Sequence, residues 1–234
     1  MASGFQFKQF EIRQEHAAMK VGVDGVLLGA WADVDSALTL LDVGAGTGLL
    51  ALMAAQRSVA AITAIEPDQE ALADAEFNFH HSQWSSRLEL IGGTLQEYKA
   101  VGVFDHILSN PPFFQEEVRS GSSKRDLARF AGHLPLEILM TRSAALLAAS
   151  GKMSFIFPAG QEFAIRSAAL TLGLSLSRFC RVVSYPGKKA HRILVELGWE
   201  EKSCRESQLI VRTASGGDYT EDYKWLTRDF YRAF

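Results

Sequence analysis

Short apolar runs alternate with amphipathic segments along this chain of 234 residues. Glycine, proline or polar residues follow most of the runs, which is typical of buried strands that end in loops. The pattern predicts strands at residues 38–43, 61–67, 87–92, 104–109 and 152–158. Strands that alternate with helices in this way form a predominantly parallel α/β sheet with helices on its faces.

The predicted helices cover residues 49–57, 68–80, 134–151, 163–173 and the last segment of the chain. Asp68 is the expected N-cap of the second helix, and Gly151 the expected C-terminal end of the third. Thr220 is the expected N-cap of the last, whose apolar side chains Tyr223, Leu226, Phe230 and Phe234 recur at helical spacing. Residues 174–186 and 190–199 predict an antiparallel hairpin that closes the sheet, and residues 5–12 predict a small N-terminal hairpin.

The composition predicts a single domain, residues 1–234, because a chain with 47% hydrophobic residues can bury one large core. No stretch approaches the roughly 18 consecutive apolar residues of a membrane span, and the first residues are too polar for a secretory signal. The two cysteines, Cys180 and Cys204, have no ligand or disulfide spacing. We therefore expect a soluble cytoplasmic protein without a metal site.

Charge changes along the chain. Residues 31–110 contain 3 basic and 11 acidic side chains, whereas residues 111–192 contain 12 basic and 5 acidic ones. This asymmetry indicates that one face of the molecule repels anions and another attracts them. A polyanionic partner is therefore a reasonable hypothesis.

A glycine-rich turn follows the first predicted core strand. Gly44, Gly46 and Gly48 allow the backbone to turn tightly and approach a ligand, and the next helix begins with free N–H groups. Glu66 ends the following strand about 20 residues later, where a carboxylate can accept hydrogen bonds from ribose hydroxyls. A tight turn without a ligand, or a nicotinamide or flavin site, would also fit the glycine spacing alone.

At these residues the chain resembles the class I S-adenosylmethionine-dependent methyltransferases, which implies a Rossmann-like fold. The resemblance implies that Gly44, Gly46 and Gly48 lie under the amino acid portion of the cofactor and that Glu66 holds its ribose. Asp42, at the start of the motif, is included among the expected cofactor-binding residues. An aspartate that many members carry near the adenine is missing, so Thr94 or the backbone near Leu95 would have to serve.

The sequence Asn110-Pro111-Pro112-Phe113 directly follows the fourth predicted strand, so its loop should meet the glycine loop at the carboxyl edge of the sheet. Prolines stiffen the loop, which pre-positions the Asn110 side chain and the Pro111 carbonyl as hydrogen-bond acceptors for an amine. Phe113 can stack on a base. The motif resembles the N/D-PP-Y/F signature of methyltransferases that act on planar amides or exocyclic amines, and Asn110 is also expected to contact the cofactor. Adenine N6, guanine N2 and a glutamine amide all remain possible acceptors.

Basic side chains gather in two tracts after this motif, and ordinary surface residues are the alternative interpretation. A Gly/Ser-containing segment and the region from Arg178 to Arg192 supply them, with aromatic residues in the second tract. The expected RNA-binding residues are Lys124, Arg125, Arg129, Arg181, Lys188, Lys189 and Arg192.

Taken together, the segments 5–31, 110–114, 188–199 and 219–234 resemble the bacterial family of methyltransferases that modify N6 of adenine 37 in a valine tRNA. The resemblance implies S-adenosylmethionine as cofactor, tRNA as partner and a protein expected to be monomeric. It also implies that residues 1–30 form a hairpin and cofactor lid, in which Lys20 and Asp24 contact the ligand, and that residues 31–234 form the catalytic core.

Other functions stay open from the sequence. An rRNA guanine-N2 methyltransferase or a protein-glutamine methyltransferase would share the Asn-Pro-Pro chemistry, although the latter usually carries an additional N-terminal helical domain. A non-catalytic RNA-binding module on a Rossmann-like core would need neither Glu66 nor Asn110.

Overall fold

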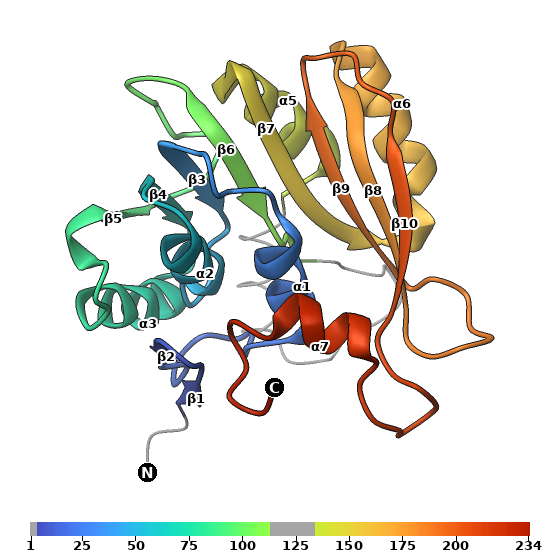
Figure 1. Cartoon of the computed structure of the whole chain (residues 1–234). Coiled ribbons are helices and arrows are strands. Elements are labelled where there is room, and N and C mark those ends of the chain that lie inside the picture. Colours follow the sequence, from blue (N-terminus) through green and yellow to red (C-terminus); the bar gives the residue numbers. More distant parts are fainter. Residues whose placement is uncertain (1–3, 113–133) are drawn as a thin grey trace, which may run out of the picture.

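The computed structural model describes residues 4–112 and 134–234. Its centre is an eight-stranded sheet with the order β10-β8-β9-β7-β6-β3-β4-β5 (Figure 1). The strands are β3 (Thr39–Val43), β4 (Ala61–Glu66), β5 (Leu88–Gly92), β6 (Phe104–Ser109), β7 (Leu147–Pro158), β8 (Ser175–Val183), β9 (Arg192–Gly198) and β10 (Arg205–Ile210). All neighbours pair in parallel except β9, which is antiparallel to both β7 and β8. The predicted parallel α/β sheet with a C-terminal antiparallel hairpin is confirmed.

Helices cover both faces of the sheet. They are α1 (Val23–Trp31), α2 (Leu49–Arg57), α3 (Gln69–His80), α5 (Leu136–Leu146), α6 (Glu162–Leu172) and α7 (Glu221–Thr227), with short 3-10 turns η1 (Ser85–Arg87) and η2 (Ala159–Gln161). Buried side chains of α1, α2 and α7 belong to one core cluster, and those of α5 and α6 belong to a second. These clusters fill the opposite faces of the sheet. None of the helices in residues 4–112 and 134–234 is both long and apolar enough to cross a membrane.

Two predicted helix caps are present. The Asp68 carboxylate accepts the Glu70 N–H at 3.3 Å, and the Thr220 hydroxyl accepts the Tyr223 N–H at 3.2 Å. The α7 helix begins after Thr220 as expected but ends at Thr227, so Phe230 and Phe234 lie beyond it. Phe230 is nevertheless buried, and the end of the chain packs against the N-terminal hairpin formed by β1 (Phe5–Gln6) and β2 (Glu11–Ile12).

The predicted helix at residues 134–151 is wrong in its second half. The α5 helix ends at Leu146, and β7 begins at once with Leu147, which pairs with Phe104 of β6. Gly151 lies inside this strand, beside a register shift in the pairing. A Cβ there would come within 2.9 Å of the Phe104 carbonyl oxygen, so glycine permits the close approach of the two strands. Pairing of Leu147 with Phe104 and of Lys152 with His106 thus ends the helix, and residues 148–151 lie within the register shift between these two pairs.

The sheet also continues beyond the predicted hairpin. The β10 strand pairs in parallel with β8 and forms the edge, so the hairpin does not close the sheet. Four of the six β10 residues are exposed, and only Leu209 is buried. The strand therefore lacks the apolar run from which the other strands were predicted.

Candidate active site

The candidate site lies where β3 and β6 end side by side. Val43 and Ser109 are register partners in these parallel strands, and the Ser109 hydroxyl donates a hydrogen bond of 2.8 Å to the Val43 carbonyl oxygen. The next residues along the two strands are Gly44 and Asn110. The prediction that the glycine loop and the Asn-Pro-Pro loop leave the same edge of the sheet is confirmed.

A pocket opens at this edge. It is bounded by the carboxyl ends of β3, β4, β5 and β6, the region where ligands bind in open α/β sheets. The lining residues are Val43, Gly44, Ile65, Pro67, Gly93, Thr94, Leu95, Gln96, Ser109, Pro111, Pro112 and Leu134. Both predicted loops therefore contribute to one pocket.

The glycine loop adopts backbone conformations that favour glycine. Gly44, Gly46 and Gly48 have φ of 70°, 56° and 82°. A Cβ at Gly44 or Gly46 would meet nothing within 4 Å, whereas a Cβ at Gly48 would collide with the Phe79 ring of α3. The first two glycines thus leave open space for a ligand, and the third allows α3 to pack against the loop.

Glu66 connects the loop to the end of β4. One carboxylate oxygen accepts the Gly46 N–H at 2.7 Å, and the other accepts the Asp68 N–H at 2.8 Å. Burial raises the pKa of Glu66 above its ordinary value, although the two N–H groups oppose the shift. The carboxylate is therefore held at the rim of the loop where the sequence predicts ribose binding, and that role stays a prediction.

Asp42 lies beneath the loop and is fully buried. Its Oδ2 accepts the Ala51 N–H of α2 at 3.0 Å, while its Oδ1 has no hydrogen-bond partner within the described part of the chain. Burial raises the pKa of Asp42 to about 7. Asp42 does not line the pocket, and its hydrogen bond joins β3 to the first turn of α2, so its expected contact with the cofactor stays a prediction.

Asn110 is half-buried and approaches α1. A Cβ on Gly25 would lie only 2.9 Å from a Leu49 methyl carbon, so glycine lets α1 pack closely against Leu49, and the same Cβ would lie at an ordinary contact distance of 3.7 Å from Asn110 Nδ2. Pro111 and Pro112 line the pocket, with ordinary trans peptide bonds throughout the described ranges. Phe113 lies outside the described residues, and its stacking role stays a prediction.

The segment after β5 contains the residues predicted to lie near the adenine. The Thr94 hydroxyl donates to Glu97 Oε2 at 2.7 Å and accepts the Glu97 N–H at 3.3 Å, so it is engaged within its own turn. Gly93, Thr94 and Leu95 nevertheless line the pocket. Both alternatives left by the sequence, Thr94 and the backbone near Leu95, therefore lie at the pocket, and the adenine contact stays a prediction.

Lys20 and Asp24, the predicted lid contacts, are not among the pocket-lining residues. Lys20 is exposed and donates to the Gln14 carbonyl oxygen. Asp24, in the first turn of α1, forms an ion pair with Arg192 Nε at 2.8 Å. This ion pair thus links a residue predicted to bind the cofactor, Asp24, with a residue predicted to bind RNA, Arg192. The α1 helix itself has seven of its nine residues buried in the core.

The predicted RNA-binding residues fall into different environments. Lys188 and Lys189 are exposed in the turn between β8 and β9, which leaves the same edge of the sheet as the pocket because β8 runs parallel to β7. Arg181 instead pairs with Glu162 and Glu206, each at 2.8 Å. Lys124, Arg125 and Arg129 lie outside the described residues. The sequence motif alone did not separate the exposed lysines from the ion-paired arginine.

Sequence reasoning missed three polar residues near the loop. Ser109 joins β6 to β3, and Asp74 and Asn78 of α3 are buried side chains that bind other segments of the chain. For Asp74 and Asn78, the sequence did contain a signal of burial, because both lie on the same helix face as the apolar residues Ala71, Ala75 and Phe79. A polar pair on a buried helix face indicates specific hydrogen-bond partners.

No group of three or more His, Cys, Asp or Glu side chains within the described ranges could hold a metal ion. The pocket is lined by glycine, proline and apolar residues together with the uncharged polar residues Thr94, Gln96 and Ser109, and the Glu66 carboxylate lies close to the glycine loop. A loop open above two glycines beside a buried carboxylate suits a ligand that carries a ribose and an amino acid portion.

Comparison with known proteins extends these observations. Residues 26–134 match the family described as methyltransferase small domain. A tRNA1(Val) (adenine(37)-N6)-methyltransferase of Vibrio vulnificus (strain CMCP6) is 40% identical over 229 residues, which cover 97% of this chain and 95% of the relative. A protein of the same name from Bacteroides thetaiotaomicron is 38% identical over 229 residues, with 97% and 96% covered. The crystal structure of a predicted O-methyltransferase from Agrobacterium tumefaciens superimposes with a TM-score of 0.69 at 20% identity, covering 88% of this chain and 96% of that one, and supports the fold.

Proposed function

The chain belongs to the family of tRNA1(Val) (adenine(37)-N6)-methyltransferases, and from that premise we propose how its residues methylate N6 of adenine 37 in a valine tRNA. It is an S-adenosylmethionine-dependent methyltransferase. The observation that carries the residue assignment is the pairing of Val43 with Ser109, because it places the glycine loop beside Asn110. Cofactor and acceptor groups would then meet at one edge of the sheet.

The residues around the glycine loop fit the cofactor. Gly44 and Gly46 leave open space above the backbone, and the Glu66 carboxylate is positioned by two N–H groups to accept ribose hydroxyls. Asp42, whose second oxygen has no hydrogen-bond partner in the described ranges, would support the loop from below. When bound, S-adenosylmethionine supplies a methyl group attached to a positively charged sulfur.

Asn110 and Pro111 would bind the acceptor. An exocyclic amine is a poor nucleophile because its lone pair is delocalised into the ring. The Asn110 side-chain oxygen and the Pro111 carbonyl would accept hydrogen bonds from its two N–H groups, which favours tetrahedral geometry at the nitrogen and directs the lone pair toward the methyl group. Pro111 and Pro112 restrict the loop, so these acceptors need little reorganisation. Phe113 would stack on the adenine ring.

The exposed turn between β8 and β9 would contact the RNA backbone. Lys188 and Lys189 leave the sheet at the pocket edge, and β8 is three strand spacings from β6, on the order of 15 Å. That separation suits phosphates a few nucleotides from the target base. The segment after the Asn-Pro-Pro loop would add contacts to RNA through Lys124, Arg125 and Arg129. Arg192 would contact RNA while its guanidinium is held by the ion pair with Asp24.

We also propose that residues 1–234 act as one domain and as a monomer in the cytoplasm. One continuous sheet joins the two hydrophobic clusters, which supports the single domain. Cys180 and Cys204 are both free thiols, which agrees with a reducing compartment.

The first experiment is methyl transfer from radiolabelled S-adenosylmethionine to total tRNA from a strain that lacks this protein. Nucleoside analysis should recover the label as N6-methyladenosine. Label in guanosine would favour a guanine-N2 acceptor. Cofactor binding without any methyl transfer to RNA would contradict the proposed acceptor, and loss of cofactor binding itself would favour a non-catalytic RNA-binding module.

A further inference from the structure

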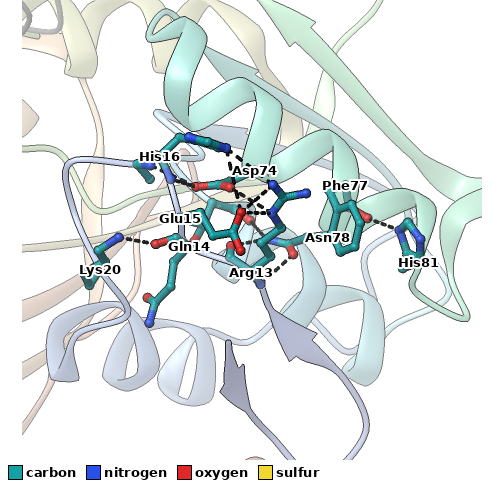
Figure 2. A network of polar contacts seen from close by, with 11 residues as sticks. Arg13, Gln14, Glu15, His16, Lys20, Asp74, Phe77, Asn78 and His81 are labelled. Carbon is teal, nitrogen blue, oxygen red and sulfur yellow. Dashed lines mark hydrogen bonds and ion pairs between the residues drawn. The ribbon is translucent and has the colours of Figure 1, made fainter. Parts of the chain in front are cut away.

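Residues 13–21, here termed the strap, connect β2 to α1 without regular secondary structure. Figure 2 shows the strap beside α3, with the side chains of Asp74 and Asn78 directed toward it. Both side chains are buried, although neither is apolar. Burial of polar groups is costly unless they are hydrogen-bonded, so their partners indicate what the pair is for.

Asn78 binds two segments at once. Its Oδ1 accepts the Arg13 N–H at 2.7 Å, and its Nδ2 donates to the Arg13 carbonyl oxygen at 2.9 Å. The same Nδ2 donates to the Thr47 carbonyl oxygen, also at 2.9 Å. A carboxylate or an aliphatic side chain could not make this set of contacts, because it needs both an acceptor and two donor hydrogens.

Asp74 holds the next part of the strap. Its Oδ2 accepts the His16 N–H at 2.8 Å and the Ala17 N–H at 2.9 Å. Burial alone would raise the pKa of Asp74, but the backbone N–H groups outweigh it and leave the pKa below its ordinary value. The carboxylate therefore stays ionised near neutral pH and fixes the strap one helical turn away from Asn78.

The two ends of this network reach the two halves of the candidate active site. Thr47 lies in the glycine loop, between Gly46, which donates to Glu66, and Gly48, which packs under α3. The strap continues into α1, where Gly25 lies against Asn110. A displacement of the strap would therefore act on the cofactor loop through Asn78 and on the acceptor loop through α1.

We propose that Asn78 is a positioning residue that couples the strap to the glycine loop, so that cofactor binding and ordering of the strap stabilise each other. The proposal rests on the proposed function, because it takes S-adenosylmethionine as the ligand of the loop. Such coupling is reciprocal: the factor by which the cofactor stabilises the ordered strap is the factor by which the ordered strap improves cofactor affinity.

Amide hydrogen exchange of the wild-type protein tests the coupling without any substitution. The reporters are the N–H groups of Arg13, His16 and Ala17, which bind Asn78 and Asp74. Saturation with S-adenosylhomocysteine should slow their exchange by about tenfold. Protection of the glycine-loop amides with no change at the three strap amides would overturn the proposal. Failure of the protein to bind the cofactor product at all would instead contradict the proposed function.

The variant Asn78→Ser tests the residue itself, because serine is too short to bridge Arg13 and Thr47. The dissociation constant for S-adenosylmethionine should rise by up to the factor measured in the exchange experiment, with the KM for tRNA unchanged at saturating cofactor. Trypsin should also cut faster after Arg13. Ile165→Val is the matched control, since this buried side chain lies in α6 on the other face of the sheet and costs about 0.5–1.5 kcal/mol of stability.

A purely structural role for Asn78 predicts a different pattern. Asn78→Ser would then lose stability as Ile165→Val does, and trypsin would cut it faster after Arg13. Its affinity for the cofactor would nevertheless equal that of the wild-type protein, and that result would overturn the proposal. If Asn78→Ser does not fold, the exchange experiment on the wild-type protein decides the question alone.

Discussion

The hydroxyl of Ser109 donates a hydrogen bond of 2.8 Å to the carbonyl oxygen of Val43, at the last residues of β6 and β3. Parallel neighbours in a sheet are about 4.8 Å apart, so the loops that follow these strands begin within one strand spacing of each other. Ser109 is fully buried, and its hydroxyl is satisfied by this contact. The bond thus fixes the relative position of Gly44 and Asn110, on which the proposed transfer depends.

Replacement of Asn110 by alanine should lower turnover by about 100-fold or more while cofactor affinity stays largely intact. The reason is the loss of one pre-positioned acceptor for the amine, an effect comparable to the loss of one oxyanion-hole donor. Steady-state methylation of tRNA, together with calorimetric cofactor binding, measures both quantities. Asn110→Asp keeps an acceptor oxygen and should lose less activity. Near-normal turnover of Asn110→Ala would contradict the assigned role.

Replacement of Glu66 by glutamine should weaken S-adenosylmethionine binding by about tenfold or more. An amide can accept the N–H of Gly46 or of Asp68 through one oxygen only, and its NH2 group faces the other donor. It also offers fewer acceptor sites to ribose hydroxyls. Isothermal titration calorimetry gives the dissociation constant, with Glu89→Gln on β5 as the control for charge removal. Equal affinity in the wild-type protein and Glu66→Gln would exclude the ribose contact.

Most of the fold was predictable because local signals and tertiary pairing agree in the first half of the chain. The helix at residues 49–57 was predicted with the bounds of α2, since Gly48 supplies a left-handed turn directly before it. Residues 147–150 were predicted as helix because Leu, Ala and Ser have no local signal for a strand, whereas in the folded chain Leu147 pairs with Phe104 and the residues after it lie in a register shift. The β10 strand was not predicted because four of its six residues are exposed and polar, so it shows no alternation of apolar and polar side chains.

The meeting of the two loops at one edge of the sheet was predictable because each loop carries a short sequence motif. Gly44, Glu66 and Asn110 were identified from the residues around them. Asn78 was not, because its partners are backbone atoms of Arg13 and Thr47, which are 65 and 31 residues away. Backbone atoms carry no sequence signature, so contacts of this kind become visible only in the folded chain.

Stability should fall as the pH rises from about 4 to about 7 because of Asp42. Its native pKa of about 7 exceeds the ordinary value of 3.8, so the unfolded chain loses this proton first and is favoured as the pH increases. Asp42→Asn keeps an acceptor for the Ala51 N–H and removes the titration. Its stability relative to the wild-type protein should improve by on the order of 3 kcal/mol between pH 5 and pH 8.

Urea unfolding of both proteins at several pH values measures this difference. The exposed Glu201→Gln is the control for removal of a carboxylate. A stability difference between Asp42→Asn and the wild-type protein that does not change with pH would show that Asp42 is ionised in the native state throughout this range.

Replacement of both Lys188 and Lys189 by alanine should raise the KM for tRNA without changing cofactor affinity. Both side chains are exposed in the turn that leaves the pocket edge, so each would neutralise one phosphate and release counterions. The slope of log affinity against log salt should decrease in magnitude by about 0.7 to 0.9 for each lost contact. Filter binding of tRNA at several salt concentrations measures this slope.

Two further variants separate this effect from a general loss of positive charge. Lys202 follows β9 and lies at the opposite edge of the sheet, because Gly198 pairs with the first residue of β8. Lys202→Ala should therefore leave tRNA affinity and its salt dependence unchanged. Arg181 is bound to Glu162 and Glu206, so Arg181→Ala should lower stability more than it lowers tRNA affinity. If Lys202→Ala weakened tRNA binding as much as the double variant, the turn between β8 and β9 would be no more than one part of a diffuse electrostatic surface.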